Sequence, residues 1–172
     1  MIPAFTEGGA AFNEDRTHRF RLWRAWAPEK PRLAWLMMNP STADETSLDP
    51  TVRRCVGFAH EWGFGGIEVF NVATLRTPSP SVLVMTHNLG IDVFEREARD
   101  AAIREVLPTI GRVVVAWGSC SLVCAEAPSV ARVFALGGVE VVALGRTKEG
   151  HPRHPLYVRG DTLPEAWPLT SN

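Results

Sequence analysis

The chain has 172 residues, of which 45% are hydrophobic and 22% charged, as is typical of a globular protein of one domain. Eighteen Lys and Arg stand against nineteen Asp and Glu, for a formal net charge of -1. This balance excludes a protein that coats nucleic acid through charge alone. There is no apolar run of about 18 residues to predict a membrane span, and the first residues lack the pattern of a secretory signal. Three cysteines are too few for a disulfide framework, so we expect a cytoplasmic protein.

The N-terminal elements begin with a glycine- and alanine-rich segment without periodicity, residues 1–15, which we expect to be a flexible arm. Residues 18–26 alternate with period two and predict a half-exposed strand with Arg19 and Arg21 on the same side. A proline-rich turn follows, and then the apolar run 32–38 predicts a strand buried on both faces. These two strands are expected to pair as a hairpin.

The rest of the chain alternates between helix and strand patterns. Asp49 and Pro50 are a typical N-cap and first helical residue, and Gly63 ends the helix that they begin. Pro78 and Pro80 are expected to interrupt the chain. Further strands are predicted at 67–71, 112–117 and 139–144, and further helices at 92–107 and, broken or restarted at Pro128, up to Leu136.

This order predicts an α/β fold: one three-layer domain over residues 16–167, with a mostly parallel four-stranded central sheet flanked by helices and an N-terminal β-hairpin extension. Residues 168–172 are expected to be a tail.

Polar side chains follow each of the four buried strands, where ligands of open parallel sheets bind. This convergence predicts a pocket. The candidates are Asn39, Ser41, Thr42 and Asp44 after the first strand, Asn71 at the end of the second, Trp117 at the end of the third, and Lys148, His151, Arg153, His154 and Leu156 after the fourth.

Plainer interpretations of these residues stay open. Asn39 and its neighbours could form only a turn, and Asn71 could cap the next segment. Loop 146–159 is richer in cations than in acids, which favours an anion-binding surface. Cys120 and Cys124 have no further ligands at the spacing of a zinc site, so they are interpreted as small hydrophobes, and no metal or cofactor is predicted.

Several motifs together resemble a bacterial, archaeal and phage family known as domain of unknown function 1643 (DUF1643). They are Met-Met-Asn-Pro-Ser-Thr-Ala-Asp at 37–44, Asp-Pro-Thr-Val-Arg-Arg-Cys at 49–55, Ala-Trp-Gly at 116–118, and Lys-Glu-Gly-His-Pro-Arg-His-Pro-Leu-Tyr at 148–157. The likeness runs from about residue 16 to residue 167, and the family name implies no activity.

The same segments also resemble, more distantly, the uracil-DNA glycosylase superfamily. Asn39-Pro40-Ser41 is similar to the motif Gly-x-Asn-Pro-Gly, Asn71 to a base-reading Asn, and 115–120 to a buried strand that ends in Leu-Trp-Gly-x-x-Ala. The segment 151–156 is similar to His-Pro-Ser-Pro-Leu-Ser with two residues inserted. Both glycines of the first motif are absent here, and either His151 or His154 could take the place of the histidine; we favour His154.

This resemblance implies hydrolysis of the N-glycosidic bond of a damaged or modified base turned out of the stack, in DNA rather than RNA. It implies that Asn39 orients the water and that His154 stabilises the departing base. Asp44 would polarise the water or stabilise the sugar cation. The base would contact Asn71, Phe70 and Trp117. The nucleic-acid contacts would be Ser41, Thr42, Lys148, His151 and Arg153 for phosphates and Leu156 for the gap left by the base.

Two alternatives remain at this point. One is a non-catalytic module that binds nucleic acid or a nucleotide, and the other is a hydrolase of free nucleotides. The slope of affinity against salt concentration would distinguish a polymer with several phosphate contacts from a free nucleotide. No metal or organic cofactor, membrane or protein partner is implied in any of the three cases.

Overall fold

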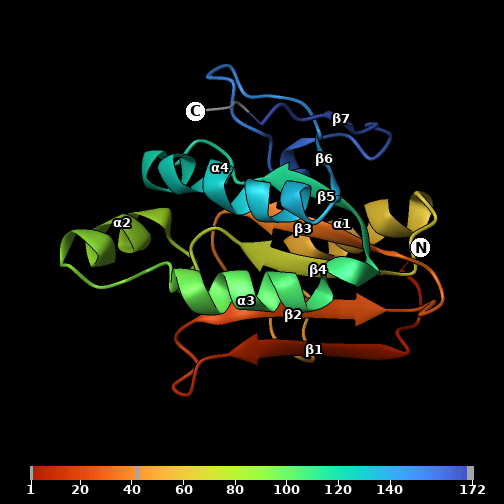
Figure 1. The fold of residues 1–172 in the computed structure, drawn as a ribbon, viewed down its shortest axis with the longest axis horizontal. Coiled ribbons are helices and arrows are strands. Elements are labelled where there is room, and N and C mark those ends of the chain that lie inside the picture. Colours follow the sequence, from red (N-terminus) through yellow and green to blue (C-terminus); the bar gives the residue numbers. More distant parts are fainter. Residues whose placement is uncertain (1, 42, 170–172) are drawn as a thin grey trace.

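In the computed structural model, which describes residues 2–41 and 43–169, seven strands of the described residues form one sheet in the order β1-β2-β4-β3-β5-β6-β7 (Figure 1). The strands are β1 Glu7–Phe12, β2 Arg19–Ala25, β3 Arg32–Met37, β4 Gly66–Asn71, β5 Ile110–Ala116, β6 Glu140–Ala143 and β7 Glu165–Ala166.

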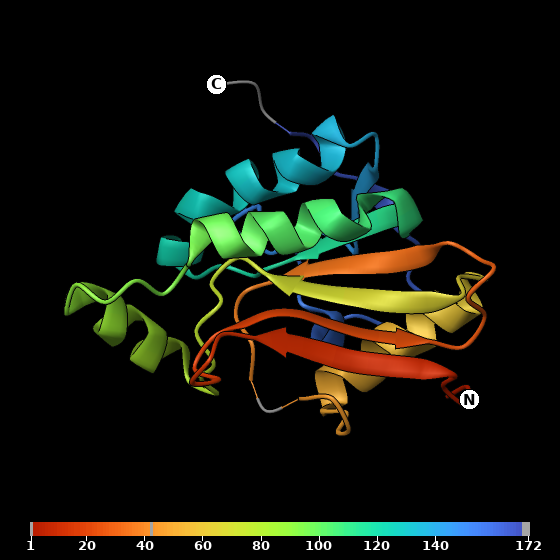
Figure 2. The same ribbon diagram turned by 60° about the horizontal axis from the view of Figure 1, so that its bottom comes forward.

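The centre of the sheet is parallel, as predicted. Strand β3 pairs in parallel with β4 on one side and β5 on the other, and β5 pairs in parallel with β6. The connecting helices are α1 Pro50–Glu61, α2 Pro80–Asn88, α3 Arg96–Val106 and α4 Ser121–Leu136. Helices α3 and α4 cover one face of the sheet and α1 covers the other (Figure 2), so the predicted three layers are confirmed.

The N-terminal hairpin differs from the prediction. Strand β2 pairs antiparallel with β1 and β4, because both edges of β3 are already hydrogen-bonded by β4 and β5. The segment 1–15, expected to be a flexible arm, therefore contains strand β1 and supplies the other half of the hairpin.

The helices follow the capping residues. The Oδ1 atom of Asp49 accepts a hydrogen bond from the Val52 amide at 2.8 Å, which confirms the predicted start of α1. Helix α3 begins at Arg96 rather than at 92, because Glu95 has a left-handed backbone with φ 36°. Helix α4 continues through Pro128 to Leu136.

Helix α2 was not predicted, and it lies apart from the body of the molecule at the end of the sheet toward which β4 points (Figure 1). Among its residues only Leu83 is buried. The chain at Ser79-Pro80 has the same cap-and-proline pattern that identified the start of α1. No helix within the described residues is long and apolar enough to cross a membrane.

The topology also places the site. From β3 the chain passes through α1 to β4 on one side, and later returns over the other face to β5 on the opposite side of β3. The connections after β3 and β5 therefore leave the sheet toward opposite faces. In open α/β sheets the carboxyl ends of two such strands border the ligand crevice.

Candidate functional site

Two adjoining cavities lie at the carboxyl ends of the parallel strands. The larger has a volume of about 700 Å³ and the smaller about 160 Å³. Met38, Pro80 and His154 line both. The larger volume is in the usual range for a small-molecule site. The smaller equals the volume of about five water molecules, which is room for one ring rather than for a whole nucleotide.

The small cavity brings together three residues that are far apart in the sequence. Asn39 follows β3, Asn71 ends β4, and His154 precedes the short 3-10 helix Pro155–Tyr157, and all three line this cavity. Ser41 lines it as well. The expected convergence of the two asparagines and the histidine is confirmed.

The amide of Asn39 is fixed by two main-chain carbonyls. Its Nδ2 atom donates to the carbonyl oxygens of Thr77 at 2.7 Å and Pro40 at 3.0 Å. Its Oδ1 atom has no protein partner among the described residues, so it is the part of the amide that can accept a hydrogen bond from a ligand or a water molecule. Asn39 thus both joins two loops and presents an oriented acceptor.

Asn71 is paired with a buried arginine. Its side chain is only 2% exposed, and its Oδ1 accepts a hydrogen bond from Nη2 of Arg19 at 3.1 Å. The Nδ2 group of Asn71 has no acceptor among the described residues and is the donor that remains for a ligand. Arg19 also lines the small cavity.

His154 is half-buried and its Nδ1 accepts a hydrogen bond from the Leu156 amide at 3.4 Å. This bond assigns the proton of the neutral ring to Nε2, which becomes the donor. Burial lowers the pKa of His154 below the ordinary value of 6.5, and the charge of Asp49 opposes part of that shift. The neutral imidazole is therefore the dominant form at pH 7.

The carboxylate of the small cavity belongs to Asp49 and not to Asp44. Asp49 lines the cavity while its Oδ1 caps α1. Asp44, which was expected to polarise the water or to stabilise the sugar cation, uses its Oδ1 to accept from the main-chain amides of Ser47 and Thr46 at 2.8 and 2.9 Å and from both hydroxyls. These bonds hold the pKa of Asp44 well below its usual range, and its side chain stabilises a turn outside both cavities.

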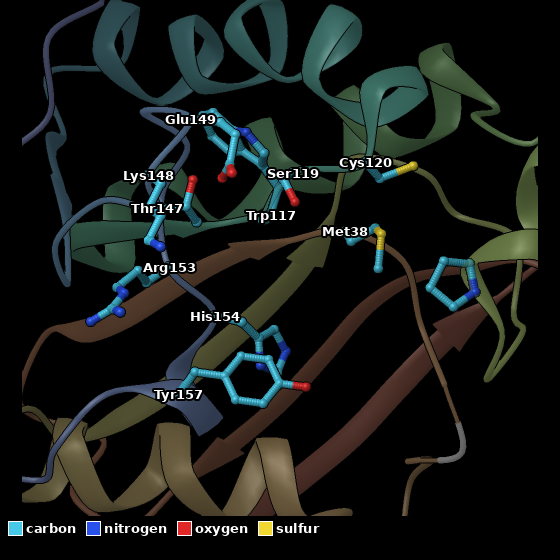
Figure 3. Close-up of a pocket in the computed structure, with 12 residues that line it drawn as sticks. Met38, Trp117, Ser119, Cys120, Thr147, Lys148, Glu149, Arg153, His154 and Tyr157 are labelled. Carbon is cyan, nitrogen blue, oxygen red and sulfur yellow. The ribbon is translucent and has the colours of Figure 1, made fainter.

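Cations, aromatic rings and an acid line the larger cavity. Lys148 and Arg153 lie on one side of it and Met38 and Cys120 on the other in the view of Figure 3. Its wall also includes Glu149 and three rings. These rings are the imidazole of His154, whose centroid lies 5.6 Å from that of Tyr157, and the indole of Trp117, which packs edge-on against Trp167 at 5.8 Å.

Besides Asp44, three of the expected site residues, Phe70, Leu156 and His151, line neither cavity. Phe70 is fully buried on the opposite face of the sheet against Phe134, because neighbouring residues of a strand point to opposite faces and Asn71 faces the cavity. Leu156 is exposed but lines neither cavity. His151 packs with its Nδ1 3.4 Å from the Sγ of Cys124. Thr42 lies outside the described residues.

Residues that the sequence analysis missed include Arg19, Asp49 and Tyr157. Arg19 was placed on the same side of its strand as Arg21, but the pairing shifts so that Phe12 lies opposite Arg19 while Ala11 lies opposite Arg21. Such a bulge re-aims a side chain. Asp49 was recognised only as a helix cap, although a cap at the carboxyl end of the sheet is also near the ligand crevice.

Metal ligands do not gather in the structure. Within residues 2–41 and 43–169 no three His, Cys, Asp or Glu side chains are arranged to hold an ion. Burial raises the pKa of the Cys124 thiol, and the neighbouring Cys120 raises it further. Cys124 donates to the Gly118 carbonyl at 3.4 Å.

The chain was compared with known proteins. No curated protein and no solved structure gives a significant match. A family model described as a protein of unknown function (DUF1643) matches residues 19–156. The matched segment begins at Arg19 and includes most of the residues that line the two cavities, such as Asn39, Asp49, Asn71 and His154. The chain therefore belongs to the DUF1643 family.

Proposed function

We propose that this protein hydrolyses the N-glycosidic bond of a damaged or modified nucleotide whose base enters the small cavity, with DNA as the preferred source. The observation that carries the proposal is the convergence of Asn39, Asn71 and His154 on one cavity of about 160 Å³. The motif resemblance to the uracil-DNA glycosylase superfamily supports the same reaction. A base held there must have left its stack, as enzymes that act on bases require.

The larger cavity would hold the sugar and its phosphates. Lys148 and Arg153 line it and carry positive charge at neutral pH, and neither has an ion-pair partner among the described residues, so their charges remain available for phosphate. Trp117 and Tyr157 add flat surfaces. Because Met38, Pro80 and His154 border both cavities, the glycosidic bond would lie beside His154.

The reaction breaks the bond between C1′ and the base nitrogen, and the electron pair leaves with the base. The neutral His154 ring would donate from Nε2 to the oxygen on which negative charge grows, a contribution of about 3 kcal/mol for one oriented donor. Asp49 would stabilise the cationic sugar and take the proton from the attacking water. Asn39 would hold that water through Oδ1. The base takes up one proton, and the sugar gains the hydroxyl.

A non-catalytic nucleotide-binding module is the second candidate. It is favoured by the geometry of Asn39, whose Nδ2 hydrogens are both used by the carbonyls of Pro40 and Thr77. In that case Asn39 and Asp49 shape the cavity, as a loop tie and a helix cap, without a role in chemistry.

The test is incubation of the protein with oligonucleotides that carry a panel of damaged or modified bases, scored for abasic sites. We expect abasic sites with at least one base, and their loss in His154→Ala. The matched control is His151→Ala, since His151 lies in the same loop but outside both cavities. Binding of the same oligonucleotides without abasic sites would identify the module instead.

A further inference from the structure

Arg19 is the only arginine of the small cavity, and it is almost completely buried, with 3% exposure. Three other buried or half-buried arginines are paired with acids: Arg21 and Arg32 with Glu68, and Arg99 with Glu126. Arg24 of β2, like Arg19, is held by neutral acceptors, but it does not line the cavity. Arg19 has no carboxylate within ion-pair distance among the described residues. Burial lowers the pKa of Arg19 to about 10, and the negative charge of Asp49 opposes part of this shift. The guanidinium therefore stays protonated at neutral pH.

A buried cation without an acid is costly, and Arg19 is held by neutral acceptors instead. Its Nη1 donates to the main-chain carbonyl of Ala43 at 2.8 Å, and its Nη2 donates to Oδ1 of Asn71 at 3.1 Å. Its Nε atom is buried without a partner. The guanidinium is therefore incompletely satisfied beside an open cavity, where a ligand or a water molecule can reach it.

The bond from Arg19 decides which end of the Asn71 amide faces the cavity. An arginine can only donate, so it selects the carbonyl oxygen of the amide. The Nδ2 group, with two hydrogens and no acceptor among the described residues, is left for the ligand. A side chain that is free to turn would offer either a donor or an acceptor, whereas Asn71 beside Arg19 offers a donor.

We propose that Arg19 is a positioning residue that fixes Asn71 as a hydrogen-bond donor and thereby makes the small cavity select a base edge with a keto oxygen over one with an amino group. The inference rests on the proposed function in one respect, that the ligand is a nucleotide base. A keto oxygen accepts from Nδ2 and lies in the positive field of Arg19. An amino group at the same place would confront a donor and a cation, and would leave both unpaired.

The test measures dissociation constants by calorimetry for two pairs of nucleotides that differ in this group: dUMP against dCMP, and dIMP against dAMP. In the wild-type protein we expect the keto member of at least one pair to bind about tenfold tighter or more, because a buried unpaired donor is strongly unfavourable. In Arg19→Met the Asn71 amide can turn, and the ratio should fall below about threefold.

The matched control is Arg24→Met. Arg24 is also 3% exposed on β2, but its guanidinium donates to the carbonyls of Asp44, Ser47 and Gly9 and makes no contact with Asn71. We expect Arg24→Met to keep the keto-to-amino ratio. Arg19→Lys, which keeps the charge and one donor nitrogen, should retain part of the keto-to-amino ratio. This variant replaces Arg19→Met in the test if circular dichroism shows that Arg19→Met does not fold.

Three results would overturn the inference: a ratio near one in the wild-type protein, no binding of any of the four nucleotides, or an equal loss of the ratio in Arg19→Met and Arg24→Met. Hydrolysis is scored separately as abasic sites. Selective binding without hydrolysis would contradict the proposed function and leave the role of Arg19 standing. Hydrolysis at equal rates from keto and amino bases would contradict the role of Arg19 alone.

Discussion

Arg54 of helix α1 donates a hydrogen bond from Nη2 to the main-chain carbonyl of Val158, with the two atoms 2.5 Å apart. Its Nε atom donates to the carbonyl of Pro155 at 3.4 Å, and its guanidinium lies over the ring of Phe58. These contacts fasten the 3-10 helix to α1. His154 immediately precedes that helix. Arg54 therefore holds the imidazole in place, although Arg54 itself lines neither cavity.

Replacing Arg54 should therefore disturb the site from outside. We expect Arg54→Met, which keeps the apolar contact with Phe58, to lower stability by about 1 kcal/mol. If His154 acts as proposed, turnover should also fall by about tenfold, since a small displacement of a catalytic group is costly. The control is Arg53→Met, because Arg53 is the exposed neighbour on the same helix. Urea denaturation and rate measurements would check both, and equal effects of the two substitutions would contradict the tie.

Substitution by the isosteric Asn distinguishes the roles of the Asp49 and Asp44 carboxylates. Asn caps a helix as well as Asp, so Asp49→Asn should keep the stability of the wild-type protein. Under the proposed reaction it should reduce turnover by about a hundredfold or more, because the negative charge that stabilises the cationic sugar is lost. Asp49→Ala should in addition lose about 1 kcal/mol of stability with the cap.

Asp44→Asn, by contrast, should leave turnover close to that of the wild-type protein, since the Asp44 carboxylate stabilises a turn outside the cavities. Measuring the rates of Asp49→Asn and Asp44→Asn side by side decides between the two acids. A larger loss in Asp44→Asn would restore the assignment made from the sequence.

The titration of His154 gives a prediction for pH. Because burial lowers its pKa, the folded protein takes up this proton at lower pH than the unfolded chain does. The neutral ring thus contributes stability above pH 6.5, and this contribution is lost as the pH falls through the folded pKa. Any turnover that needs the neutral ring should fall in the same acidic range.

Nuclear magnetic resonance of the imidazole would measure this pKa directly. We expect a value below 6.5 in the wild-type protein and a lower one in Asp49→Asn, since the Asp49 charge favours the protonated ring. An unchanged His154 pKa in Asp49→Asn would mean that the two side chains do not interact, and a rise would contradict the predicted direction.

The sheet contains a buried charge cluster whose loss should affect folding alone. Glu68 is fully buried and accepts from Arg21 Nε at 2.7 Å and Arg32 Nη1 at 2.6 Å. Glu68→Gln should lower the free energy of unfolding by about 3 kcal/mol, because two arginines lose the buried carboxylate that they share and keep only the more exposed Glu105 and Glu7. Asp161→Asn, at the exposed pair with Arg159, should have little effect. Urea denaturation curves would compare them, and similar midpoints for Glu68→Gln and the wild-type protein would contradict the prediction.

Much of the fold could be predicted from the sequence, because long apolar runs and helix caps act locally. The run 32–38 and the pair Asp49-Pro50 identify β3 and the start of α1 without knowledge of their neighbours. Helix α2 has the same cap-and-proline signal at Ser79-Pro80, but it buries only Leu83 and so lacks the apolar stripe that would have extended this signal to a helix.

Asn39 and Asn71 could be predicted because each stands at the end of a buried strand, whereas His154 was chosen from the motif resemblance; all three line the small cavity. Phe70 could have been excluded by the period of the strand, because its neighbour Asn71 faces the cavity. Arg19 could not have been found, since a one-residue shift in strand pairing sets its direction and leaves no mark in the sequence. The choice between Asp44 and Asp49 depends on which turn forms, and this is fixed by hydrogen bonds of Thr46 and Ser47.

The last strand has a practical consequence for anyone who purifies this protein. Strand β7 pairs with β6, and just after it Trp167 packs between the guanidinium of Arg146 and the indole of Trp117, which lines the larger cavity. Cutting the chain before Glu165 would remove the packing of Trp167 against the wall of the larger cavity and would expose the edge of β6. An affinity tag joined directly behind Trp167 would press on the same wall, so a tag is better placed at the other terminus.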